Sequence, residues 1–307
     1  MRIAGFETRV RDRLKARLDV AARDYMREGI ATSPDFLSPP NEPSLSAPDS
    51  VSWRIFKNPA ALFIGGVTAV LLEFADPRVR SGVWEHSTFR HDPVTRLKRT
   101  GLAAMVTVYG AESTARNMIA KVRHMHDRVS GQTPDGVPYA ASDPELLNWV
   151  QATASFGFLE AYSAYVAPLT DADRDRFYGE ATKTAALYGA TGAPGSLAAQ
   201  RALFEAACDH LEPSDIIFEF IKIMREAPAL PQPAQFGQRV LVRAAVDLLP
   251  PEIRGILELG PRYGLRPFER EVITTLAARA ESVCLPSSPP SQACVRLGLP
   301  ADYLHRS

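Results

Sequence analysis

A histidine on the apolar face of a predicted helix is the residue of this chain best suited to chemistry. Residues 111–129 have helical periodicity. Within them Ile119, Val122 and His126 recur at spacings of three and four, which predicts that the His126 imidazole points into the protein. His124 falls among polar neighbours and is expected to be solvated. His126 is therefore a candidate metal ligand, with a hydrogen-bonded core histidine as the alternative, and His124 is not.

The second candidate site is a basic segment at the start of another predicted helix. Arg96, Arg99 and Thr100 share one side of that helix, and the small residues Ala103 and Ala104 follow them on the same side. Cations and a hydroxyl beside small side chains would form a wall that a flat ligand can approach closely. The alternative is a solvated basic face that pairs with neighbouring carboxylates.

Those carboxylates belong to a titratable cluster. Glu85 and His86 precede His91 and Asp92 by a few residues, so the four could bind a non-haem metal. A spacing of five between the histidines puts their rings on different faces of a helix, which argues against a shared ion. Glu85 and Asp92 could instead cap a helix or pair with Arg96.

Motifs in a fixed order link these segments. They are Leu-Phe-Ile-Gly-Gly (62–66), Glu85-His86-Ser87, Arg96-x-x-x-Thr100, Met-His126-x-x-Val and Asp143-Pro-Glu-Leu-Leu-x-Trp-Val. Over roughly residues 53–270, this pattern resembles the catalytic domain of rubber oxygenases (latex clearing proteins) and of MpaB-type oxygenases.

The resemblance implies an all-helical fold that holds haem b without a covalent bond and adds dioxygen to a carbon–carbon double bond of an isoprenoid. It implies that His126 is the proximal iron ligand, and that Arg96 and Thr100 line the distal side. Arg99 stands where rubber-cleaving members have a distal lysine, and a guanidinium is a poor iron ligand. Glu85 would supply the acid or base that those members carry near the haem.

Two further departures set this chain apart from the pattern. Asp76 replaces a histidine in Phe-Ala-Asp-Pro, and Gln151 replaces a histidine in Trp-Val-Gln-Ala. A divergent branch of the family is therefore expected. Three hypotheses follow: a haem oxygenase for a lipophilic substrate, a non-enzymatic binder of haem or an apolar ligand, and a fold retained without haem.

Composition limits the remaining functions. The 307 residues carry 35 basic and 35 acidic side chains, so a nucleic-acid partner is not expected. Three cysteines without Cys-x-x-Cys spacing favour a reducing compartment, and the N-terminus lacks a secretory signal, so a cytoplasmic location is expected. The longest apolar run, residues 59–75, is broken by Glu73 and is shorter than the roughly 20 residues that span a bilayer. A buried core helix is expected there.

The chain divides into three predicted regions. An amphipathic helix occupies residues 1–31 and packs on the body or on a second subunit, which leaves homo-oligomerisation open. A Pro- and Ser-rich linker covers 32–50, and a single all-α domain of about ten helices covers 51–307. Helices are expected over 143–166, 170–188, 196–210, 213–226, 235–249 and 267–283. Residues 131–139 are expected to form a loop between the His126 and Trp149 helices that could shape the mouth of a pocket.

Overall fold

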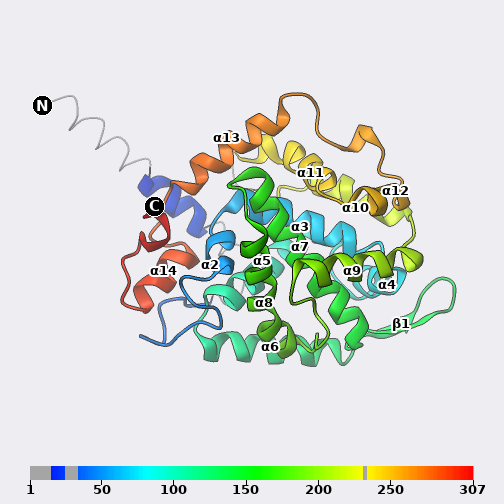
Figure 1. The fold of residues 1–307 in the computed structure, drawn as a ribbon, viewed down its shortest axis with the longest axis horizontal. Helices are drawn as coiled ribbons and strands as arrows, with labels where there is room; N and C mark the ends of the chain where they lie inside the picture. The colour runs from blue at the N-terminus through cyan, green and yellow to red at the C-terminus, as the bar shows by residue number, and fades with distance from the viewer. Residues whose placement is uncertain (1–14, 25–33, 231–233, 307) are drawn as a thin grey trace, which may run out of the picture.

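The computed structural model describes residues 15–24, 34–230 and 234–306 and is almost entirely helical (Figure 1). Its helices are α2 (Val51–Phe56), α3 (Pro59–Glu73), α4 (Pro77–His86), α5 (Pro93–Tyr109), α6 (Glu112–His126), α7 (Pro144–Tyr165), α8 (Asp171–Tyr188), α9 (Leu197–Ala207), α10 (Asp215–Glu226), α11 (Gln238–Asp247), α12 (Pro251–Ile256), α13 (Glu269–Glu281) and α14 (Pro289–Arg296). Short 3₁₀ turns η1 (Cys208–His210), η2 (Ala234–Gly237), η3 (Pro261–Tyr263) and η4 (Tyr303–His305) connect or follow them. The predicted all-α, single-domain class is confirmed.

Four helices begin with the same local signal, an Asn or Asp followed by proline. The pairs are Asn58-Pro59, Asp76-Pro77, Asp92-Pro93 and Asp143-Pro144. In each pair the side-chain oxygen accepts a hydrogen bond from a backbone N–H of the first turn, and the proline occupies a position that needs no donor. Asp76 thus has a structural role where related sequences read histidine: it starts α4 and pairs with Arg78.

Every helix expected from residue 143 onward is present, because caps and breakers mark its ends. Two short helices, α12 and α14, were not predicted. The loop expected at 131–139 is correct only in its middle, because two strands, β1 (Ser130–Gln132) and β2 (Pro138–Ala140), pair on either side of it as an antiparallel hairpin. Its tip contains Asp135-Gly136, and Gly136 has a φ of 81°. Such a turn favours glycine at this position and is a hairpin signal.

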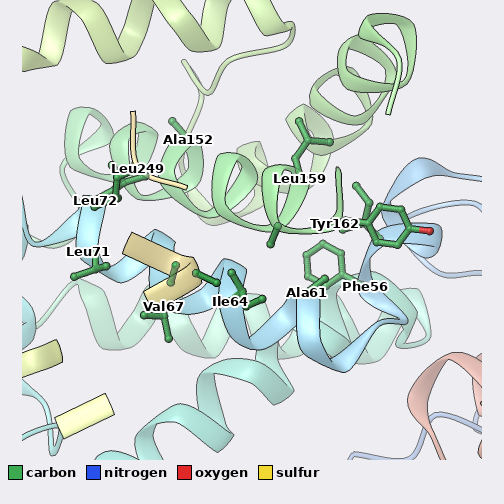
Figure 2. Packing of buried hydrophobic residues seen from close by; sticks show 14 of the residues in the cluster. Phe56, Ala61, Ile64, Val67, Leu71, Leu72, Ala152, Leu159, Tyr162 and Leu249 are labelled. Carbon is green, nitrogen blue, oxygen red and sulfur yellow. The ribbon is translucent and has the colours of Figure 1, made fainter. Parts of the chain in front are cut away.

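The core is organised around α3 and α7, which pack side by side within the apolar cluster shown in Figure 2. Their backbones meet at two glycines. A Cβ on Gly65 would lie 2.8 Å from the Gly157 carbonyl oxygen, and a Cβ on Gly157 would overlap the Gly65 carbonyl oxygen. Only glycine permits helices to approach this closely. The next residue, Gly66, has no such constraint, since its Cβ would reach nothing nearer than the Phe158 ring edge at 4.0 Å.

Residues 34–50 contain no helix or strand, only turns, bends and irregular chain, and α14 holds them against the body. The Arg296 guanidinium donates to the carbonyl oxygens of Glu42 (2.9 Å) and Phe36 (3.0 Å) and to the Ser44 hydroxyl. Both Arg296 and Phe36 are buried. This side chain therefore fixes the segment by satisfying backbone groups that water does not reach.

Replacing Arg296 by alanine is expected to lower the free energy of unfolding by about 3 kcal/mol, because two buried carbonyls lose a charged donor. Urea denaturation would measure the loss. Arg306→Ala is the matched control, since Arg306 pairs with Asp302 at the surface and is 59% exposed. That variant should change stability by no more than about 0.5 kcal/mol. Equal losses in the two variants would contradict the role given to Arg296.

In the N-terminal region, the structure describes only residues 15–24, which are helical. The rest of the amphipathic helix predicted over 1–31 lies outside the described residues, and the three-region division stays a prediction. Within the described part no single helix is long and apolar enough to cross a membrane. The pair α3 and α4, bent by 112° at their junction, passes that test of length and composition only when taken together.

Candidate functional site

His126 is the last residue of α6, and its imidazole is half-buried. His124, two residues earlier, is exposed, and its Nε2 lies 2.6 Å from an Arg128 guanidinium nitrogen. The two rings therefore have the orientations that the helical spacing predicts.

The surroundings of His126 keep its ring neutral. Burial lowers the pKa of His126 below its usual value, the nearby Arg96 cation lowers it further, and Asp127 opposes the shift. At pH 7 the imidazole is therefore unprotonated, which is the form that can donate a nitrogen lone pair to a metal. No hydrogen bond from a described residue occupies this ring.

Arg96 extends from α5 toward both His126 and α3. Its guanidinium donates to the Thr100 hydroxyl one turn later, and that hydroxyl donates back to the Arg96 carbonyl oxygen at 2.9 Å. Thr100 thus fixes the rotamer of Arg96. Burial lowers the pKa of Arg96, Glu73 raises it, and the exposed Arg99 lowers it by repulsion. Arg96 is half-buried, whereas Arg99 and Thr100 are exposed.

Glu73 is a member of this group that sequence reasoning missed. It is the last residue of α3 and is half-buried. Burial raises its pKa to about 7, and the Arg96 cation only partly offsets the shift. The sequence signal for Glu73 is that it is a single carboxylate within an otherwise apolar run, where the sequence analysis considered it only as a break in the run. The structure therefore brings Glu73, Arg96 and His126 together from α3, α5 and α6.

One face of α3 leads to this group. Phe63, Gly66, Val70 and Glu73 recur at spacings of three and four, and all are half-buried. Every other residue between positions 64 and 72 is buried. In the central helix of the core, such a row marks a face that neighbouring side chains do not fully cover. The row is apolar up to its last member, Glu73.

The chemical types of these side chains match what a planar apolar cofactor with one metal requires. His126 supplies one neutral nitrogen donor, the α3 row supplies an apolar face, and Arg96 supplies a cation. Among the described residues no three His, Cys, Asp or Glu side chains gather as a metal site, so a self-contained protein cage is not the arrangement seen. Two open surface hollows, one along α13 and one beside Arg254, are lined by none of the site residues.

The structure gives Glu85 a different environment from the one expected. The Tyr139 hydroxyl donates to the Glu85 carboxylate at 3.1 Å and lies 3.2 Å from His86 Nε2. This cluster ties α4 to strand β2. The carboxylate coupled to Arg96 is that of Glu73, and the alternative in which Arg96 pairs with Glu85 or Asp92 has no support among the described contacts. Asp92 instead caps α5.

The remaining candidates of the sequence analysis have ordinary roles. His91 is exposed. Gln151, which replaces a histidine of related sequences, is half-buried on α7 and donates to the Ser155 hydroxyl at 3.2 Å.

Comparison with known proteins adds three findings. The family described as "ER-bound oxygenase mpaB/B'/Rubber oxygenase, catalytic domain" matches residues 53–280. Two mycobacterial relatives, Uncharacterized protein Mb2261 of Mycobacterium bovis and Uncharacterized protein Rv2237 of Mycobacterium tuberculosis, are each 30% identical over 119 residues. These residues make up 37% of this chain and 46% of each relative, so the chain spans about half the length of the curated relatives it matches. No solved structure matches the chain significantly.

Proposed function

We propose that this chain, which belongs to the family of the ER-bound oxygenase mpaB/B'/rubber oxygenase catalytic domain, is a haem b-dependent oxygenase for a lipophilic, isoprenoid-like substrate. Family membership supports oxygenase chemistry with a small-molecule substrate and dioxygen. The haem and the substrate class are our proposals. The observation that carries them is the convergence of a neutral His126, Arg96 and Glu73 at the end of the uncovered α3 row.

In this proposal His126 would hold the iron through a ring nitrogen, and the α3 row would supply apolar surface to the cofactor. Bound haem would supply an iron at which dioxygen is activated. Arg96, held in place by Thr100, stabilises negative charge that develops in the pocket. Because the guanidinium is already held by Thr100, it needs little further reorganisation during the reaction.

Glu73 holds or releases a proton in the same pocket. A carboxyl with a pKa of about 7 is protonated in part of the molecules at neutral pH, so it can act as either acid or base. We assign this role to Glu73 rather than to Glu85, whose carboxylate is bonded to Tyr139. Arg99 is exposed and always charged, so direct coordination by this residue forms no part of the proposal.

A visible absorption spectrum of protein purified from haem-replete cells tests the proposal. We expect a Soret band, and dioxygen uptake when isoprenoid compounds are added. Colourless protein would refute the haem assignment.

A second candidate function, binding of haem or an apolar ligand without turnover, is favoured by one observation. The residue in the place of the family's distal lysine, Arg99, is exposed. A Soret band without dioxygen uptake across a broad lipid panel would support this candidate against the oxygenase.

A further inference from the structure

Helix α13, drawn in orange, lies along one edge of the molecule in Figure 1. Its inner side packs against α3, α7 and α11, and Ile273 and Ala277 are buried there. On the other side large apolar residues recur every four positions: Phe268 is 81% exposed, Val272 is 52% exposed and Leu276 is 50% exposed. Val283, 38% exposed, continues the row beyond the end of the helix.

This α13 row, Phe268, Val272, Leu276 and Val283, is unlike scattered surface residues. Single exposed apolar side chains are common and need no explanation. Two of these residues lie on α13, one directly before it and one shortly after it, and together they expose apolar surface whose free energy falls when another apolar phase covers it.

Positive charge accompanies the row. Arg279 falls between Leu276 and Val283 on the same side of the helix, and Arg262 and Arg266 precede the row; all three are exposed. The carboxylate of Glu269 is bound by Arg243 of α11. The exposed Glu271 lies about 100° around the helix from Val272, to the side of the row. The chain as a whole has zero formal charge, so the arginines are a local concentration.

The helix over residues 15–24 also exposes apolar side chains, and it contacts the chain just beyond α13. Its Asp19 accepts hydrogen bonds from the backbone N–H and the hydroxyl of Ser287, both at 2.9 Å, just beyond Val283. Leu18 and Val20 on that helix are 43% and 45% exposed. A helix that contacts the chain just beyond Val283 therefore also exposes apolar side chains.

We propose that the α13 row docks on the surface of a lipid bilayer that contains anionic lipids. The apolar side chains enter the boundary between headgroups and acyl chains, and the arginines contact lipid phosphates. This arrangement adsorbs the protein to one leaflet without crossing it. The proposal does not depend on the haem, and it would place the molecule where lipophilic compounds dissolve.

The charge of this face argues against two other molecules or segments that could cover it, a second copy of the chain and the N-terminal residues. A second copy seated on this face would bring two sets of arginines together, and like charges in an interface are unfavourable. The N-terminal residues 1–14 carry four arginines, at positions 2, 9, 11 and 13, against two acidic residues, at positions 7 and 12, so they also bring positive charge. Anionic lipid headgroups have the complementary sign.

Vesicle sedimentation with the full chain tests the proposal. Wild-type protein is expected to sediment with vesicles of equal phosphatidylglycerol and phosphatidylcholine, and much less with phosphatidylcholine alone. Val272→Glu should lower the partition coefficient at least about tenfold by placing a charge in the row. Arg279→Gln should lower it about fivefold. The matched control is Val295→Glu on α14, where the valine is 50% exposed, and it should bind as wild type does.

Three results would overturn the proposal. One is a failure of wild-type protein to prefer the anionic vesicles, and another is an equal effect of the Val272 and Val295 substitutions. The third is a wild-type dimer, detected by light scattering, that Val272→Glu converts to a monomer, because the row would then be an interface between copies. Both valines are at the surface, so far-ultraviolet circular dichroism of the variants should match wild type.

Discussion

Replacing Gly157 by alanine is expected to destabilise the protein by about 3 kcal/mol or more. The added Cβ would overlap the Gly65 carbonyl oxygen, and it would also lie 3.1 Å from the backbone nitrogen of Ala69. Both contacts are with backbone, so no side-chain rotation relieves them and α3 must move away from α7. That movement would open the core shown in Figure 2.

Gly66→Ala is the matched control for this prediction. It adds the same methyl group to α3, where the nearest atom would be 4.0 Å away, and alanine has a higher helix propensity than glycine. Its stability should equal that of wild type or exceed it by up to about 1 kcal/mol. Urea denaturation of both variants measures the difference. If the two substitutions have equal effects, the helices do not meet at Gly65 and Gly157.

Glu73→Gln is expected to abolish a pH dependence of stability that wild-type protein shows between about pH 4.5 and 8. The folded state raises the pKa of this carboxyl from 4.5 to about 7, so the folded protein binds the proton more tightly than the unfolded chain does. Stability contributed by the protonated carboxyl is complete below pH 4.5 and is lost as the pH rises through 7. The loss amounts to at most about 3 kcal/mol. Glutamine cannot ionise, so the variant does not undergo this loss.

The difference in unfolding free energy between wild type and Glu73→Gln, followed over that pH range, isolates this one group. The variant should become more stable relative to wild type as the pH rises. Glu205→Gln on the exposed face of α9 provides the comparison and should retain the wild-type profile. A constant difference between wild type and Glu73→Gln at all pH values would show that Glu73 titrates normally and would remove the proposed proton-holding role.

The local signals in the sequence explain why most of the fold could be predicted. Asx-Pro pairs and Thr170 mark helix starts that side-chain oxygens cap in the structure. The apolar run ending at Glu73 forms the buried helix α3, as predicted. The hairpin was missed because each strand is only three residues long, too short to show alternation, and its Asp135-Gly136 turn was overlooked.

The sequence could predict only those features of the site that depend on a single helix. Periodicity was enough to distinguish His126 from His124, since that contrast depends on one helix alone. The partner of Arg96 depends on how α3, α4 and α5 cross, and no local pattern encodes that crossing. The sequence pattern therefore points to Glu85 for the role that we propose for Glu73. It carries no signal that Tyr139, on strand β2 beside α4, donates to Glu85.

Ligation of iron by His126 is the central claim, and chemical rescue tests it most directly. His126→Gly is expected to lose the Soret band, since no other nitrogen ligand is proposed, and added imidazole should restore it by occupying the vacated space. His124→Gly, two residues away and exposed, should keep the wild-type spectrum without imidazole. An unaltered Soret band in His126→Gly would contradict the claim.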